Sequence, residues 1–324
     1  MTDWRPTADL DRLRHRAELL NAIRDFFRDR NVLEVDTPVL SAAAATDPAL
    51  ASLRTRYTGP GAPRGTTLYL HTSPELAMKR LLAAGSGPIY QMCKVFRDGE
   101  RGGRHNPEFT LLEWYRPGFD HHRLMDEAEA LLGAVTPRPL PRAARWAYRD
   151  LFIAVAGVDP FTAGVPELVR CLDRHGVAPP PHMPNTDRDP WLDLLLTHVV
   201  EPRLGPAPVF VYDYPATQAA LARLRPGDPP VAERFELYMD GMELANGFHE
   251  LADAAEQRRR LEYDLARRRA AGTPEPPLDE RFLAALEHGL PDCAGVALGV
   301  DRLAMCAAGV SSIDQVIAFP VERA

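Results

Sequence analysis

The sequence predicts an α+β domain in which helices flank an antiparallel β-sheet, and three observations lead to this prediction. Two strand-like runs, Ile89 to Arg97 and Glu108 to Tyr115, are separated by a polar, glycine-rich turn. Glu233 to Tyr238, the turn residues Asp240-Gly241 and the segment from Met242 onward repeat this hairpin pattern. Helix-like segments come in blocks between the hairpins, whereas a doubly wound sheet would alternate them with single strands.

The N-terminal part predicts a helix followed by short extended segments. Apolar residues recur at three- and four-residue steps from Asp9 to Arg30, which indicates an amphipathic helix. Val32 to Thr37 is a short extended segment closed by Pro38. Tyr69 to His71 is strand-like, and after it Ser73 is expected to cap a helix from Leu76 to Ala84 with Pro74 in its first turn.

The remaining elements follow from the same patterns. Further helices are expected around residues 123–133, 164–174, 191–200 and 253–269. A glycine-bearing apolar strand from Cys293 to Gly299 and a helix from Val300 to Ala308 complete the chain.

Composition limits the classes of function. The 324 residues are 45% hydrophobic and 26% charged, which is typical of a globular protein with room for one large domain. No apolar run is long enough to span a bilayer, so we expect a cytoplasmic protein without a membrane partner. The net charge of −7 argues against nucleic acid as a stable partner. The four cysteines lie far apart, so their spacing suggests neither a disulfide framework nor a zinc site.

Arginine is unusually common in this chain. Only two of the 38 basic residues are lysine, which indicates a compositional bias rather than a functional signal. We therefore interpret the arginine clusters at 258–260 and 267–269 as the solvated face of a helix.

The first hairpin has the residue types of a binding site. Arg97 lies where a strand meets a turn, and its planar guanidinium could hold a phosphate through two hydrogen bonds. Phe109, Leu111, Glu113 and Tyr115 share one face by the two-residue period. Such a face could stack a flat ring, pair with an ammonium group and hydrogen bond a polar group. A half-buried sheet face without a ligand is an equally good explanation of this hairpin alone.

The second hairpin suggests a metal site. With a turn at Asp240-Gly241, Tyr238 faces Glu243, and Glu236 lies diagonal to Glu243 at a Cβ separation of about 7 Å. Two carboxylates at that spacing suit Mg²⁺, although two surface glutamates facing solvent are the commoner case. The small residues and the Asn-Gly step from Leu244 to Glu250 suggest a β-bulge that re-aims Asn246, Phe248 and Glu250.

The third segment, Gly295 to Leu303, joins a strand to a helix. Its small residues would let a flat base approach the backbone. Arg302 falls in the first turn of the helix, whose positive end favours phosphate. A packing strand before a helix is the alternative explanation.

The order of these segments resembles the class II aminoacyl-tRNA synthetases. The resemblance places motif 1 at about 9–40, motif 2 at about 89–115 and motif 3 at about 293–309. The runs TSPE, RHNPEFT, LLEWY and ELANGFHEL narrow it to the lysyl-tRNA synthetase branch. The chain starts at the motif 1 helix, without an anticodon-binding domain. ELANGFHEL and GVALG also depart from the runs typical of lysyl-tRNA synthetases. The whole chain, 1–324, therefore resembles a single catalytic domain of the elongation factor P–(R)-β-lysine ligase family.

This resemblance implies an activity and leaves two alternatives. The implied enzyme is an ATP-dependent ligase that activates (R)-β-lysine, or lysine, as an aminoacyl-adenylate. It would transfer the amino acid to the ε-amine of one lysine of elongation factor P. A truncated synthetase that charges tRNA or makes free lysyl-adenylate is one alternative, and an inactive regulatory paralogue is the other.

The resemblance also implies roles for individual residues. Arg97 would hold the α-phosphate of ATP and Arg302 the γ-phosphate, as the catalytic pair. Phe109 would stack on adenine, and Glu236 and Glu243 would bind Mg²⁺. The other expected nucleotide-site residues are Asp98, Gly99, Asn106, Leu244 and Gly299. The expected amino-acid site comprises Ser73, Pro74, Glu75, Glu113, Tyr115, Asn246 and Glu250.

Two positions depart from the family pattern, and the resemblance also implies an oligomeric state. Family motif 2 usually has glutamate at the position of Gly99, which puts the adenine contact on that side in question. Ala297 replaces a glycine of the lysyl-tRNA synthetases, so it could sort lysine isomers, and Ala245 is the alternative determinant. Motif 1 also implies a homodimer through Leu13 to Pro38.

Overall fold

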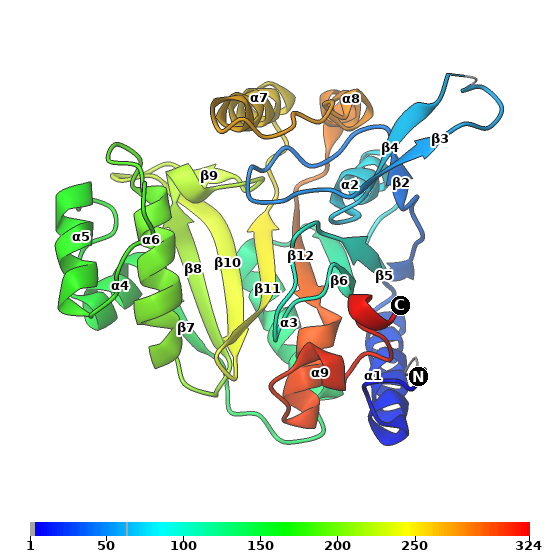
Figure 1. Ribbon diagram of the computed structural model, residues 1–324, viewed down its shortest axis with the longest axis horizontal. Helices are drawn as coiled ribbons and strands as arrows, with labels where there is room; N and C mark the ends of the chain where they lie inside the picture. The colour runs from blue at the N-terminus through cyan, green and yellow to red at the C-terminus, as the bar shows by residue number, and fades with distance from the viewer. Residues whose placement is uncertain (1–3, 63) are drawn as a thin grey trace. The chain divides into compact units, whose positions relative to one another are not determined.

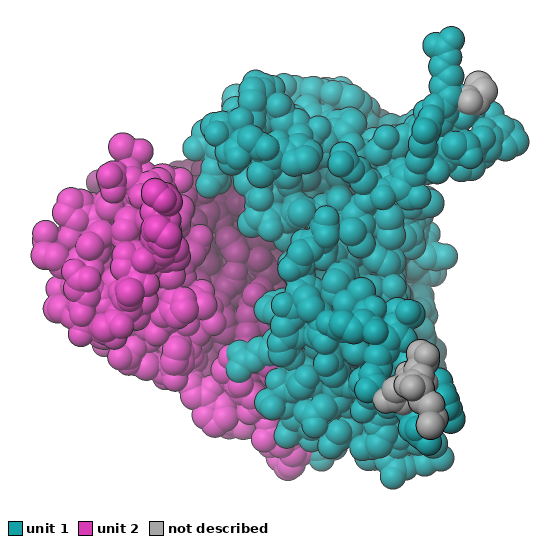
Figure 2. All heavy atoms as spheres, in the orientation of Figure 1, with its two compact units in different colours: residues 1–118, 134–137, 252–324 teal, residues 119–133, 138–251 magenta. Residues whose placement is uncertain are grey.

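The chain forms two compact units. The computed structural model describes residues 4–62 and 64–324, so Met1 to Asp3 of the polar N-terminus lie outside the described residues. Figure 2 shows the division: unit 1 comprises Met1–Gly118, Ala134–Pro137 and Ala252–Ala324, and unit 2 comprises Phe119–Gly133 and Arg138–Leu251. One catalytic domain over 1–324 stays a prediction.

Unit 1 is built on four strands of mixed direction. They lie in the order β1 (Leu33–Glu34), β5 (Ile89–Phe96), β6 (Glu108–Pro117) and β12 (Cys293–Gly299). β1 runs parallel to β5, whereas β5–β6 and β6–β12 are antiparallel. The predicted antiparallel α+β sheet and the first hairpin are therefore confirmed (Figure 1).

Two helices of unit 1 are fixed to this sheet. Asp9 caps α1 (Leu10–Arg28), and Phe27 of this helix stacks on Tyr90 of β5 at a centroid distance of 4.5 Å. Asp301, at the start of α9 (Val300–Ala308), forms a 2.6 Å ion pair with Arg16 and accepts a hydrogen bond from the Thr110 backbone. The predicted strand and helix at 293–308 have these same bounds.

The rest of unit 1 is a small sheet with three helices. The sheet has the strand order β2 (Leu40–Ser41), β4 (Thr66–Leu70), β3 (Arg54–Tyr57). The helices are α2 (Glu75–Ala83), α7 (Ala254–Ala270) and α8 (Glu280–Gly289). The sequence patterns did not indicate β2, β3 or α8, which are short or lie in proline-rich surroundings.

Two sequence expectations in this part are wrong. Pro74 lies at the N-cap of α2, not in its first turn, although the Ser73 hydroxyl still accepts a hydrogen bond from the Glu75 N–H. Arg268 does not lie on a solvated face, because it is 6% exposed and donates to backbone carbonyls of Thr46, Asp47 and Leu50. A long side chain can reach a neighbouring loop, which helix periodicity alone does not reveal.

Unit 2 has a sheet with a helical layer. Its strands are β7 (Ala144–Ala147), β8 (Val209–Pro215), β10 (Val231–Met239) and β11 (Met242–His249), with β9 (Leu224–Arg225) paired to β10. β7 and β8 are parallel, and the other pairs are antiparallel. The predicted second hairpin is confirmed as β10–β11.

The helices of unit 2 supply most of its core. They are α3 (His121–Val135), α4 (Tyr148–Ala156), α5 (Val165–Arg174) and α6 (Asp189–Leu195), and α6 continues as a π-helical turn over Leu196–Val200. Short 3-10 turns follow at Glu201–Arg203 and Ala216–Gln218, and in unit 1 at Ile313–Gln315 and Val321–Arg323. Tyr148, Phe152 and Tyr214 form a buried aromatic cluster. The predicted helices are confirmed, and α4 was not predicted.

No helix in the described part of the chain combines the length and apolar character needed to cross a bilayer.

Candidate active site

The candidate residues fall into two sets, one in each unit, and each set is described by itself. In unit 1 the large side chains of β6 face small residues of β12. Glu113 pairs with Ala297, Tyr115 with Gly295 and Leu111 with Gly299. The predicted face of β6 therefore continues onto a strand whose residues fill little space, which would let a flat or extended ligand lie over β12.

Glu113 is the centre of a buried polar network. It is 2% exposed, and its two oxygens accept hydrogen bonds from the hydroxyls of Ser73 (2.7 Å) and Tyr115 (2.6 Å). Burial and then the charge of Glu75 raise the pKa of Glu113 to about 8, although both hydroxyls lower it. The structure thus brings Ser73, Glu113 and Tyr115 together as predicted.

Glu75, the neighbouring acid, already has a partner in the protein. Its carboxylate pairs at 2.7 Å with the ammonium group of Lys79, one turn further along α2, and Lys79 is fully buried. Sequence analysis did not single out Lys79, although a Glu–Lys pair at four-residue spacing is a recognisable helix signal. Because Lys79 neutralises Glu75, Glu113 remains the carboxylate whose hydrogen-bond partners are neutral hydroxyls.

Arg97 and Phe109 lie together at the base of the motif 2 turn. The Arg97 guanidinium lies 5.0 Å from the centroid of the Phe109 ring and 3.6 Å from a Glu100 carboxylate oxygen. The Asp98 N–H donates to the Ala51 carbonyl, which fixes the strand end. Gly99 has φ +80°, a left-handed conformation that a glutamate side chain would strain. The backbone conformation at this position therefore suits glycine.

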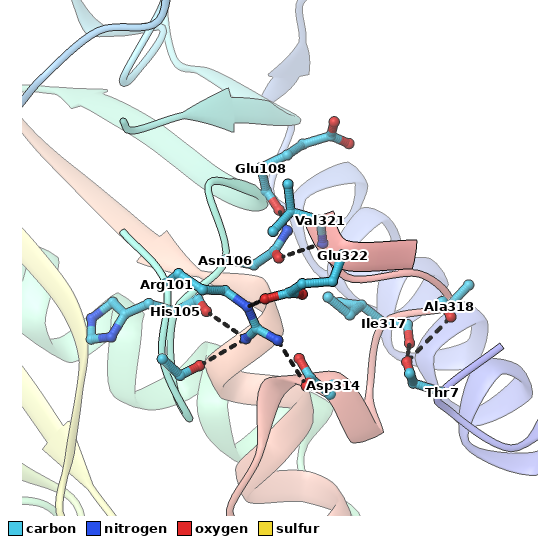
Figure 3. Close-up of polar contacts among 11 residues, drawn as sticks. Thr7, Arg101, His105, Asn106, Glu108, Asp314, Ile317, Ala318, Val321 and Glu322 are labelled. Carbon is cyan, nitrogen blue, oxygen red and sulfur yellow. Dashed lines mark hydrogen bonds and ion pairs between the residues drawn. The ribbon is translucent and has the colours of Figure 1, made fainter. Parts of the chain in front are cut away.

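The motif 2 turn is held by the C-terminal segment (Figure 3). Arg101 donates to Asp314, to Glu322 and to two carbonyls of its own turn. The Asn106 amide donates to the Glu108 carbonyl at 2.6 Å and accepts from the Val321 N–H at 3.1 Å. Asn106 is 3% exposed, and these two hydrogen bonds fix its position in the turn; its expected contact with the nucleotide stays a prediction.

Arg302 contacts the same turn. Its guanidinium lies 2.7 Å from Nε2 of His105. Burial, followed by the charge of Arg302, lowers the pKa of His105, so the imidazole accepts this hydrogen bond as a neutral ring. Arg97, Arg302 and Gly99 therefore all belong to, or contact, one loop of unit 1.

In unit 2 the β10–β11 hairpin has the predicted register, and the structure locates its β-bulge. Tyr238 pairs with Glu243, and Glu236 pairs with Asn246, so Glu236 and Glu243 are diagonal neighbours as expected. The predicted bulge lies at Leu244, where the register shifts between Leu237 and Tyr238. Without this extra residue Ala245 would face Glu236, so the bulge is what places Asn246 there.

Glu236 is strongly bound by the protein. Arg234 donates to one carboxylate oxygen, and the hydroxyls of Tyr214 (2.7 Å) and Tyr238 donate to the other. Arg234 also donates to the Asn246 side chain at 3.2 Å. Burial lowers the pKa of Arg234, but the combined electrostatic effects of Glu236, Tyr214, Glu243 and Tyr238 outweigh burial and raise that pKa. Sequence analysis missed Arg234, although it lies two residues before Glu236 on the same strand face.

These residues still fit a magnesium ion. A carboxylate offers about four acceptor positions, and the three hydrogen bonds to Glu236 leave one for a cation. Glu243 contributes a second negative charge near Arg234, so two carboxylates outweigh one guanidinium. Glu236 and Glu243 would hold the ion, which would neutralise charge on the phosphates of bound ATP. Glu250 is 1% exposed and Leu244 2% exposed, both in the same hairpin region.

Comparisons with known proteins extend these observations. Residues 1–323 match the family described as tRNA synthetases class II (D, K and N). The chain is 53% identical to the elongation factor P–(R)-β-lysine ligase of Vibrio cholerae, over all of this chain and 99% of that protein. It is also 53% identical to the ligase of the same name from Edwardsiella ictaluri and 51% identical to that of Proteus mirabilis, each over all of this chain and 99% of the relative.

Proposed function

Because this chain belongs to the class II tRNA synthetase family, and is therefore an ATP-dependent ligase, we propose that it joins (R)-β-lysine, or lysine, to elongation factor P. The amide would form at the ε-amine of one lysine of that protein. Support comes from relatives that carry this name and match the chain over its full length.

The observation that carries the proposal is the Glu113 network of unit 1. A buried carboxylate whose hydrogen-bond donors are hydroxyls is costly as an anion, and its raised pKa reflects this cost even though the charge of Lys79 offsets part of it. The ammonium group of a lysine would supply the missing positive charge. Lys79 makes the site selective, because it neutralises Glu75 and leaves one carboxylate to be matched.

The chemistry needs no side-chain nucleophile. A carboxylate oxygen of the amino acid attacks the α-phosphorus of ATP while the bond to the β-phosphate oxygen breaks, and pyrophosphate leaves. The acceptor amine then attacks the adenylate carbonyl, loses a proton and releases AMP. Arg97, aligned by Phe109 and Glu100, would stabilise the charge that grows at the α-phosphate. Arg302 would hold the terminal phosphate, and Glu236 and Glu243 would hold Mg²⁺.

The test measures both half-reactions. The protein is incubated with ATP and either (R)-β-lysine or L-α-lysine, and pyrophosphate exchange is measured. Elongation factor P or tRNA is then added, and the mass of each acceptor is determined. We expect added mass on elongation factor P alone. A charged tRNA with unmodified elongation factor P would favour the truncated-synthetase alternative, and no exchange would favour the inactive paralogue.

Arg97→Ala is the matching variant. Loss of one preorganised charge donor should slow adenylate formation by about 10²–10³-fold without changing the melting temperature. Arg259→Ala, an exposed arginine of α7, is the control and should leave exchange unchanged. Wild-type exchange in Arg97→Ala would show that the motif 2 assignment is wrong.

We also propose a homodimer through the motif 1 region. Leu10, Leu33, Val39 and Leu40 are between 37% and 63% exposed, which is a high density of exposed large apolar residues for one segment. Leu33→Glu should convert dimers to monomers in analytical ultracentrifugation. Tyr263→Glu, which alters an equally exposed apolar residue on α7, should not. A wild-type protein that is monomeric at micromolar concentration and fully active would contradict the dimer.

A further inference from the structure

A second cluster of ligand-type side chains lies in unit 2. His121 opens α3, Glu233 lies in β10 and His249 ends β11. One ligand atom from each lies within 4.8 Å of the other two. Arg234 pairs with Phe248, so Glu233 and His249 come next on the two strands and point to the opposite face from Glu236 and Asn246. The cluster is therefore separate from the proposed magnesium ligands.

His121 provides a second, independent observation. It is 1% exposed, and neither of its ring nitrogens has a hydrogen-bond partner among the described residues. The nearest charged atom, Oδ1 of Asp213, lies 3.5 Å from Nε2 and is itself buried without a hydrogen bond. Burying an imidazole in this way costs free energy that a bound cation would offset.

The charges around the cluster favour a divalent cation. Glu233 places one oxygen 2.6 Å from Nδ1 of His249 and the other 3.7 Å from Arg225. Arg225 also pairs with Asp213, and Asp120 interacts electrostatically with His121 and His249. The carboxylates of Glu233, Asp213 and Asp120 outnumber the single guanidinium of Arg225. The region around the His121 and His249 rings therefore has an excess of negative charge.

We propose that His121, Glu233 and His249 bind Zn²⁺ or another late first-row divalent cation, with Asp213 as the neighbouring acidic group. Two imidazole nitrogens and a carboxylate oxygen are a donor set that zinc prefers, whereas Mg²⁺ selects oxygen ligands. The ion would take the place of the hydrogen atom between Nδ1 of His249 and the Glu233 carboxylate.

The site joins three segments that are far apart in sequence. It fixes the start of α3 to the first residues of β10 and the last residue of β11, at the end of the hairpin away from its turn. Such a site stabilises the folded chain by an amount that grows with the logarithm of the ratio of ion concentration to Kd. Because β11 also carries Asn246, the ion supports the strand without contacting its substrate-facing side.

The experiment uses the whole chain, freed of metal with a chelator. Zn²⁺ is titrated in competition with a chromogenic chelator, and Co²⁺ is added separately to record its visible absorption. We expect one equivalent per chain, a nitrogen- and oxygen-ligated Co²⁺ spectrum and a higher melting temperature with Zn²⁺. A large excess of Mg²⁺ should not displace the zinc.

Variants separate this site from general zinc binding. His121→Leu and His249→Gln should each weaken binding by about tenfold or more and abolish the melting shift. His121→Leu should still fold, since it replaces a buried ring by an apolar side chain. His122→Gln, the exposed neighbour, is the control and should bind as wild type. Absent zinc binding, displacement by Mg²⁺, or equal affinity in wild type and His121→Leu would overturn the proposal.

Discussion

The two units each bury a glutamate beneath a tyrosine hydroxyl, but they balance its charge differently. Glu113 of unit 1 accepts only from the hydroxyls of Ser73 and Tyr115, and burial raises its pKa. Glu236 of unit 2 accepts from Tyr214 and Tyr238 and also from the partly buried guanidinium of Arg234.

The difference shows how a carboxylate is reserved for a ligand. A buried charge with a permanent counter-ion is part of the folded framework, because removing either partner leaves the other unpaired. A buried carboxyl without one is held partly protonated until a cation arrives. This difference supports the proposal that Glu113 binds the substrate ammonium and that Glu236 belongs to a framework that could also hold a metal.

The largest expected effect is on stability. Glu236→Gln removes the paired carboxylate of the partly buried Arg234 and should lower the free energy of unfolding by up to about 3–5 kcal/mol. Glu113→Gln removes no counter-ion and should cost much less. Urea unfolding of both variants at pH 7 measures the contrast.

A double variant checks the cause. Arg234→Gln combined with Glu236→Gln should recover part of the loss, because no unpaired charge remains. Equal destabilisation by Glu236→Gln and Glu113→Gln would remove the distinction between the two carboxylates.

The next effect is on pH dependence. Only the ionised form of Glu113 pairs with an ammonium group, so kcat/KM for lysine in adenylate formation should rise about tenfold per pH unit below the pKa of about 8. Folded Glu113 binds more protons than the unfolded chain between pH 4.5 and about 8, so stability should fall with rising pH there. Steady-state kinetics and urea unfolding over this pH range measure the two opposite trends.

Glu113→Gln is the reference for both trends. Its residual activity and its stability should lose these slopes, while the KM for ATP should keep its wild-type pH profile. A wild-type pH slope for lysine in this variant would assign the titration to another group.

The smallest expected effect concerns isomer choice. Ala297 lies directly opposite Glu113, so its methyl group takes up space beside the predicted ammonium site. Ala297→Gly should shift the preference from (R)-β-lysine toward L-α-lysine by roughly tenfold. This is the discrimination between substrates that about one methyl group provides in a packed pocket. Adenylate formation with each isomer gives the ratio.

Ala245→Gly is the matched control for that ratio. Ala245 pairs with Leu237 on the face of the hairpin opposite Asn246, so this variant should leave the isomer ratio unchanged. A shift with Ala245→Gly and none with Ala297→Gly would reverse the assignment.

The sequence by itself determined the two hairpins, the strand and helix at 293–308 and the shared face of β6. These features depend on two-residue alternation, on turn residues such as Asp240-Gly241 and on helix periodicity, all of which act over a few residues. Its motifs also determined the family.

Only the tertiary structure decided which charged side chains are buried and which distant segments they contact. Lys79 and Arg234 pair with acids of their own helix or strand, but their burial depends on distant segments. The carbonyl contacts of Arg268 are with a segment more than two hundred residues away. Asn106 and Arg101 contact the C-terminal segment, 215 and 221 residues away along the chain. His121, Glu233 and His249 meet because α3 and the β10–β11 hairpin come together in the fold. Charge compensation depends on distance in space, and sequence spacing fixes that distance only within one element.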